Sequence, residues 1–186
     1  MLGLYIGDSW LLKESHPAAT FFLHSHTPTQ VSGLHQGGAK MSKPVKIGPL
    51  GGPGGDERNA QVTPGRLSSV TIHSGGTIDA ISFTYIGTDY VQYSAGPWGR
   101  TLNTESTITL EPTDYVTAIS GTIGRAYDNE PVVTSLKIST FKGKDNKTYG
   151  TPNGTPFHIP VHEGKVVGFF GRSGDMLDAI GIYVAP

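Results

Sequence analysis

Cysteine is absent from all 186 residues of this chain. Its absence excludes disulfides, thiolate catalysis and cysteine-ligated metal sites, and leaves nothing that requires an oxidising compartment. We therefore expect a location in the cytoplasm, with the nucleus as a second one. The chain also lacks any apolar run near the roughly 18 residues that a membrane-spanning helix needs, so no membrane insertion is expected.

Charge is scarce and nearly balanced. Only 16% of the residues are charged, and the formal net charge is -1. Such a chain has no electrostatic attraction for nucleic acid, which is therefore excluded as a partner. Also missing is any window of helical length with apolar residues at i, i+3, i+4 and i+7. Glycine and proline are abundant instead, at 26 and 13 residues, which is typical of a compact protein with many tight turns.

From Val45 onward, short runs alternate between apolar and polar residues and are bounded by Gly, Pro, Asn or Asp. The clearest runs cover residues 67–73, 81–86, 106–110 and 133–139, and all are rich in β-branched or aromatic residues. This pattern predicts an all-β domain of about ten to twelve strands.

The first forty residues lack this pattern. We interpret residues 1–40 as an N-terminal extension, either disordered or an artefact of gene prediction, and residues 41–186 as one domain. The extension has no basic segment followed by a long apolar one, so it does not resemble a secretory signal. Its histidines, His24, His26 and His35, have no Asp, Glu or Cys beside them in a ligand pattern, so we expect no metal site there.

The domain contains internal repeats. The sequence of residues 173–183 echoes that of residues 74–85, and residues 47–51 echo residues 95–99. A weaker third copy runs from residues 124–128 into residues 133–138. Three related sheets would follow, facing a common axis and enclosing one core, with the turns gathered at the ends.

The last copy carries the best candidate binding site. Gly174 to Asp178 form a turn into the final strand, which places the Asp178 carboxylate at the rim of a sheet beside peptide N–H groups without ladder partners. A carboxylate accepts from two hydroxyls and the N–H groups donate to oxygens, an arrangement suited to a vicinal diol. The glycine-rich residues 51–55 are the natural second wall, because glycine lets the backbone approach a ligand closely.

Residues 45–55 and 168–184 together resemble the first and last segments of cereal mannose-binding jacalin-related lectins, and the likeness extends over residues 41–186. The resemblance implies a β-prism I fold of three four-stranded antiparallel Greek-key sheets with pseudo-threefold symmetry. It further implies a non-catalytic lectin without metal or cofactor, a homodimer that binds mannose, glucose and high-mannose glycans, and a role in plant stress or defence.

The resemblance also assigns roles to residues. The N–H of Gly55 would donate to the O3 side of the sugar, Asp175 and Met176 would donate backbone N–H groups to O5 and O6, and Asp178 would accept from O4 and O6. Gly174 opens this turn. In galactose-preferring relatives the chain is cut before the equivalent of Gly55, and the uncut loop here implies mannose or glucose. Leu50 and Pro53 depart from the family pattern, where Trp and Asn or Asp are common, and leave the loop shape open.

The other copies carry weaker candidates. Gly75, Gly76, Thr77 and Asp79 are similar to a second sugar site of some family members, although the opposing residues 96–103 lack the paired glycines. The third copy, residues 124–128, is more typical of a plain turn.

Two other functions stay open at this point. A degenerate domain could keep the fold and act as a protein-interaction module without sugar binding. A glycosidase would need Asp175 and Asp178 as its paired carboxylates. The glycine-rich, solvent-facing rim offers no apolar pocket for a general acid, so we expect no enzyme.

Overall fold

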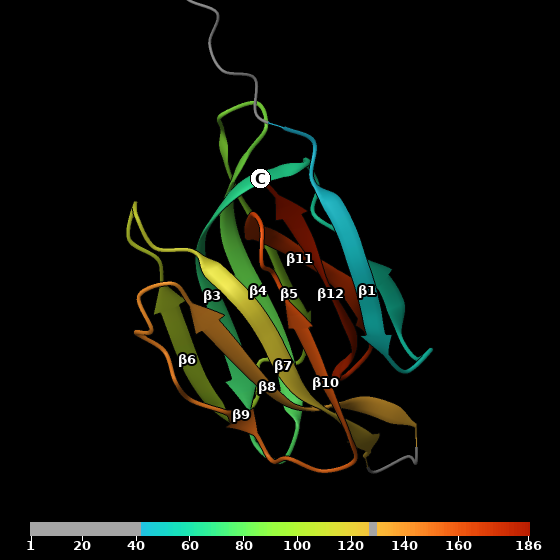
Figure 1. Cartoon of the computed structure of the whole chain (residues 1–186). Helices are drawn as coiled ribbons and strands as arrows, with labels where there is room; N and C mark the ends of the chain where they lie inside the picture. Colours follow the sequence, from blue (N-terminus) through green and yellow to red (C-terminus); the bar gives the residue numbers. More distant parts are fainter. Residues whose placement is uncertain (1–41, 127–129) are drawn as a thin grey trace, which may run out of the picture. The chain divides into compact units, whose positions relative to one another are not determined.

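A computed structural model describes residues 42–126 and 130–186, so the predicted extension over residues 1–40 lies outside the described residues (Figure 1). The described residues form twelve strands and no helix, so none of their segments is a helix that could cross a membrane. The strands are β1 (Val45–Gly51), β2 (Asp56–Arg58), β3 (Pro64–Ser74), β4 (Ile78–Gly87), β5 (Gln92–Gly99), β6 (Thr104–Thr109), β7 (Val116–Arg125), β8 (Pro131–Thr140), β9 (Tyr149–Gly150), β10 (Thr155–Pro160), β11 (Lys165–Ser173) and β12 (Leu177–Ala185).

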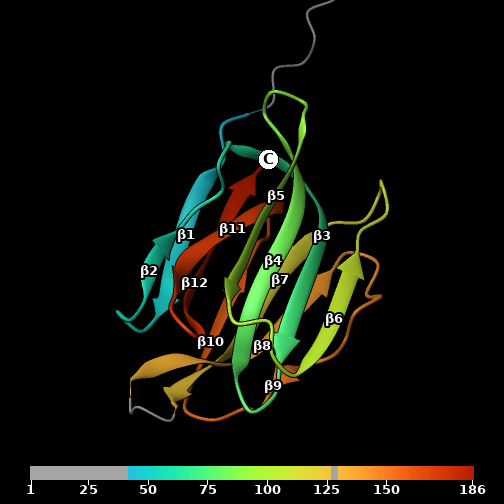
Figure 2. The same ribbon diagram turned by 180° about the vertical axis from the view of Figure 1, so that it is seen from behind.

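The strands pair antiparallel into three groups of four, in the orders β1-β12-β11-β2, β5-β4-β3-β6 and β10-β7-β8-β9. The first and third groups are joined by a single bridge between Val166 and Val116. Figure 2 shows the β3–β6 sheet nearest the viewer, with the other two sheets around it. The prediction of three four-stranded antiparallel sheets is therefore confirmed.

All three sheets share one connectivity. Each is built on a central hairpin, β3-β4, β7-β8 or β11-β12, and its two outer strands lie one on each side of that hairpin. In the first sheet the outer strands come from the beginning of the chain, so β1 lies beside β12 and closes the domain. This repetition is the Greek-key pseudo-threefold arrangement of a β-prism I fold.

The core lies between the three sheets because alternate residues of each hairpin point inward. Phe83 of β4 is its centre, with ring centroids 5.4 Å from Phe169 of β11 and 5.3 Å from Trp98 of β5, both in edge-on geometry. Other fully buried members come from every sheet: Ile72, Ile81, Tyr85, Ile119, Leu136, Ile138, Leu177, Ile180 and Ile182. One continuous apolar core therefore holds the sheets together.

The first sheet is covered on its outer face as well as on the face toward the core. Phe170 and Tyr183 form a second small cluster there with Val167 and Ala185. The Lys46 ammonium lies 4.6 Å from the ring centroid of Phe170 and also donates to Asn59 Oδ1 at 2.9 Å. The segment after β2 and the long stem of Lys46 thus shield apolar surface that would otherwise face solvent.

The hairpin turns β3–β4 and β11–β12 lie at the same end of the domain, together with the end of β7 and the start of β8 (Figure 1). The C-terminus lies at the opposite end. The candidate residues of all three copies are therefore gathered on one rim.

Replacing Phe169 by Ala should lower the free energy of unfolding by about 3–5 kcal/mol, because it leaves a cavity at the meeting point of the sheets. Phe141→Ala is the matched control: Phe141 is 63% exposed and only stacks on Tyr115, so its loss should cost at most about 1.5 kcal/mol. Urea unfolding of both variants measures the difference, and equal losses would contradict this description of the core.

Candidate functional site

The first and second copies of the repeat are built in the same register. Gly51 of β1 pairs with Ala179, and Gly99 of β5 pairs with Ala80 at the equivalent position. Leu50 and Trp98 come one residue earlier and pair with Ile180 and Ile81. Leu50 packs against the core as Trp98 does, so the smaller side chain keeps the strand in place.

Asp178 lies at the start of β12, and only 7% of its surface is exposed. Its Oδ2 accepts a hydrogen bond of 2.7 Å from the N–H of Gly174, and its carbonyl accepts one of 2.8 Å from the N–H of Gly52. A carboxylate accepting a backbone N–H makes a charge-assisted bond, stronger than a neutral one. The turn and the glycine-rich loop thus hold Asp178 from both sides.

The loop packs directly on this carboxylate. A Cβ at Gly54 would lie 2.9 Å from Asp178 Oδ1, and a Cβ at Gly55 would lie 2.5 Å from Oδ2 and 2.3 Å from the Gly174 nitrogen. Gly55 also has a φ of +57°, in the left-handed region that side chains disfavour. Only glycine at both positions allows the backbone to come this close.

Arg172 fastens the loop from outside. Its Nε donates to the carbonyls of Pro53 at 3.0 Å and Gly54 at 2.9 Å, and its Nη2 donates to that of Gly55 at 2.6 Å. Three consecutive carbonyls are thereby held by one guanidinium, whose planar set of donors suits this role. The loop keeps its contact with Asp178 although Pro53 stands where Asn or Asp is common.

The turn between β11 and β12 is tied to the second copy. Arg100 forms an ion pair of 2.9 Å with the Asp175 carboxylate, and its backbone N–H donates to the Asp175 carbonyl at 3.0 Å. Thr77 Oγ1 lies 3.3 Å from the sulfur of Met176. The side chains of Asp175 and Met176 therefore contact the second copy. Their backbone N–H groups have no hydrogen-bond partner among the described residues.

The second candidate site is formed but differs in its contacts. Asp79 is 6% exposed, and its Oδ2 accepts from Asn103 Nδ2 at 2.7 Å. Gly76, Thr77 and Asp79 line a pocket of about 270 Å³ together with Arg100, Leu102, Asn103, Asp175 and Met176. Gly75 lies at its edge, where an added Cβ would meet Asn103 Nδ2 at 2.7 Å.

The third candidate is described only in part. Gly124 and Arg125 end β7, and Asp128 lies outside the described residues. Arg125 and Ala126 line a separate hollow with Gly76 and Thr77, so this end of the third sheet borders the second copy.

The sequence interpretation assigned no individual contact to three residues of this rim: Arg172, Arg100 and Asn103. Arg172 and Arg100 stand close in sequence to the repeated motifs, but nothing in the spacing shows which backbone or carboxylate a flexible cation will reach. For Asn103 a signal did exist, because it occupies the position before an edge strand where the first copy has Gly55.

Gly55→Ala should destabilise the domain by more than about 1 kcal/mol, because the methyl group would overlap the 173–174 backbone in a left-handed conformation. Gly76→Ala is the matched control. A Cβ at Gly76 meets nothing within 4 Å, so its effect should stay within about 0.5 kcal/mol. Thermal or urea unfolding compares the two, and equal stability would show that the loop does not pack as described.

Comparison with known proteins places this geometry in a family. Residues 47–183 match the family described as the Jacalin-like lectin domain. Horcolin from Hordeum vulgare subsp. vulgare is 57% identical over 148 residues, which cover 78% of this chain and 100% of horcolin.

Solved structures agree with the sequence relatives. AcmJRL, a mannose binding jacalin related lectin from Ananas comosus, has a TM-score of 0.74 and 36% identity over 78% of this chain and 99% of that chain. The artocarpin–mannotriose complex has a TM-score of 0.70 and 31% identity, with the same coverage. Lectins hold carbohydrate without transforming it, so the expectation of a non-enzymatic protein is confirmed. The chain belongs to the Jacalin-like lectin domain family.

Proposed function

We propose that this lectin domain binds mannose and glucose, and through them mannose-containing glycans, at Asp178. The observation that carries the proposal is the close packing of the backbone of Gly54, Gly55 and Gly174 around the Asp178 carboxylate. A nearly buried carboxylate beside unpaired N–H groups supplies both acceptors and donors to neighbouring sugar hydroxyls.

The site contains both hydrogen-bond acceptors and hydrogen-bond donors. Asp178 accepts from two hydroxyls of the sugar, and the N–H groups of Gly55, Asp175 and Met176 donate to its oxygens. None of these three N–H groups donates to another group of the described chain. The N–H of Gly174 is not available to the sugar, because it donates to Asp178 Oδ2 and orients the carboxylate. Arg172 and Arg100 keep the two walls in position before the sugar arrives, which lowers the entropic cost of binding.

The proposed preference for mannose or glucose over galactose assumes that the loop between β1 and β2 stays uncut. Gly55 then offers a peptide N–H to the sugar and not a charged amino terminus. Solved relatives support the same sugar, because AcmJRL is a mannose binding lectin and artocarpin was solved in complex with mannotriose.

A single site of this kind binds weakly. About five hydrogen bonds, each worth about 0.5–1.5 kcal/mol and offset by the cost of immobilisation, give roughly millimolar affinity. A homodimer would present at least two sites to one branched glycan, and the second contact would form at a high effective concentration. The proposal therefore includes a homodimer, which sedimentation equilibrium would refute by finding only monomer.

The proposed setting is the plant cytoplasm and nucleus, in a stress or defence response. The chain contains no cysteine, so its stability does not depend on an oxidising compartment. Imaging of the full chain fused to a fluorescent protein tests this location, and accumulation in the secretory pathway would contradict it.

Calorimetric titration with methyl α-mannoside should show binding to the wild type, whereas methyl α-galactoside should give none. Asp178→Asn should weaken mannoside binding about 100-fold or more, because the substitution removes the charge and one acceptor. Asp56→Asn is the control: it changes the same charge beside the loop, but its side chain is 86% exposed and pairs with Arg58 at 3.6 Å, away from the Asp178 carboxylate. A folded wild type that binds neither sugar would favour the alternative of a protein-interaction module.

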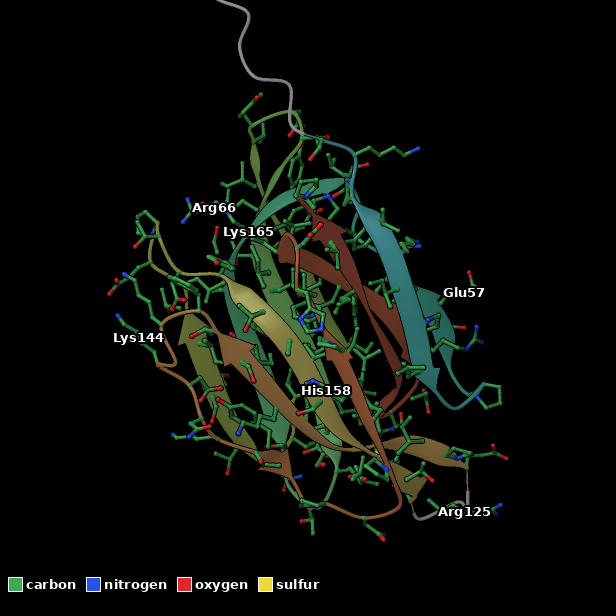
Figure 3. All side chains as sticks on the ribbon, in the orientation of Figure 1. Glu57, Arg66, Arg125, Lys144, His158 and Lys165 are labelled. Atoms are coloured by element: carbon green, nitrogen blue, oxygen red, sulfur yellow. The ribbon has the colours of Figure 1, made fainter. Side chains whose placement is uncertain are left out.

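Arg172→Met should weaken mannoside binding about tenfold while leaving the fold intact. Methionine keeps much of the apolar stem but loses the three bonds to the loop carbonyls, so the loop must be ordered by the sugar itself. Arg66→Met serves as control, since Arg66 lies at the end of the domain away from Arg125 and the rim (Figure 3). Equal mannoside affinities for the two variants would show that Arg172 does not order the loop for binding.

A further inference from the structure

Asn103 occupies the position in the second copy that Gly55 occupies in the first. In the first copy Ser173 pairs with Asp56, and in the second Ser74 pairs with Thr104. The residue before each edge strand is therefore Gly55 in one case and Asn103 in the other. Their φ angles are +57° and +56°, so the backbone turns in the same way at both positions.

The two positions differ in what they present to the aspartate. Gly55 has no side chain, and its backbone packs against Asp178. Asn103 has one, and its Nδ2 donates to Asp79 Oδ2 at 2.7 Å, a charge-assisted hydrogen bond. In the first copy the equivalent Oδ2 accepts from the N–H of Gly174, whereas the N–H of Gly75 donates to the Thr77 carbonyl. Asn103 thus gives the second carboxylate a side-chain donor that the first copy does not have.

The other oxygen of Asp79 has only a weaker donor. Thr77 Oγ1 lies 3.3 Å from Oδ1 and also 3.3 Å from the sulfur of Met176, and its single proton can serve one of them at a time. Space is available beside the carboxylate, in the pocket of about 270 Å³. This copy differs from the first in that the donor to Oδ2 is the side chain of Asn103, which lies beside the carboxylate, and not the N–H of the turn.

The loop that carries Asn103 also supports the first copy. Arg100, three residues earlier, holds the carboxylate and the carbonyl of Asp175 in the turn of the first site. Opening the second copy by moving this loop outward would therefore break contacts of the first. A sugar at Asp79 must displace Asn103 with the loop in place.

We propose that Asn103 closes the second copy by acting as an internal ligand of Asp79, so that each chain holds one hexose, at Asp178. This inference rests on the proposed function of the Asp178 site. A charge-assisted hydrogen bond that must be broken lowers affinity by about 10- to 100-fold. Since a monosaccharide site of this kind starts near millimolar affinity, the closed copy binds no measurable hexose.

The test is a titration of the full isotope-labelled chain with methyl α-mannoside, followed by amide chemical shifts in two-dimensional NMR. In the wild type, the amides of Gly174, Asp175 and Met176 should shift, and those of Gly75, Gly76 and Asp79 should not. In Asn103→Gly both groups should shift in saturable fashion. Glycine is suited to the φ of +56°, so the variant should fold, and its spectrum reports this directly.

Two further variants sharpen the result. Leu102→Gly is the matched control: it introduces glycine into the same loop, but Asn103 remains on Asp79, so only the first group should shift. The double variant Leu102→Gly with Asn103→Gly rebuilds the glycine pair of residues 54–55 and should bind at both sites. Saturable shifts of the second group in the wild type, or none in either variant that lacks Asn103, would overturn the inference.

The outcomes separate this inference from the proposed function. If the wild type shows no shifts in the first group, the Asp178 site itself fails. If the first group shifts and removal of Asn103 adds nothing, the Asp178 site stands and only the closure by Asn103 is wrong. Adding Asp178→Asn to Asn103→Gly should leave shifts in the second group alone, which assigns the new site to Asp79.

Discussion

The contact between the glycine-rich loop and the Asp178 carboxylate is the constraint on which the site depends. Asp178 is nearly buried at a sheet rim, where its carboxylate accepts a charge-assisted hydrogen bond from the Gly174 N–H and the glycine-rich loop packs against it. That closeness requires glycine at positions 54 and 55. Arg172 fixes the loop and Arg100 fixes the opposing turn, so both walls stand ready before a ligand binds.

The threefold repeat explains how this site arises and why its copies differ. Each sheet needs the same hairpin turn at the same end, because the common core fixes strand register and length. The turns are therefore retained for structural reasons, and only the residues facing each aspartate decide whether ligand can enter. Gly55 places no side chain beside the first carboxylate, which the Gly174 N–H holds, whereas the side chain of Asn103 lies on the second and donates to it. The second copy supports the turn of the first site, because Arg100 pairs with Asp175 and Thr77 contacts Met176.

Much of this could be predicted from the sequence. Alternating strands, the echo between residues 74–85 and 173–183, and the glycine-rich residues 51–55 led to the correct sheets and brought Gly55, Gly174 and Asp178 together. The contacts of long or polar side chains could not be predicted. Arg172 and Arg100 reach groups over 70 residues away in sequence, a choice that depends on the packed geometry. The covered outer face of β11 and β12 was also missed, because Lys46 and the segment after β2 shield it only in the fold.

The most direct test of the account is a crystal structure of the full chain grown with methyl α-mannoside. The account predicts one sugar per chain on the rim, with two hydroxyls on the Asp178 carboxylate, ring and exocyclic oxygens facing the N–H groups of Gly55, Asp175 and Met176, and Asn103 still bonded to Asp79. A sugar bound away from Asp178, or an Asp178 site left empty at saturating mannoside, would contradict it.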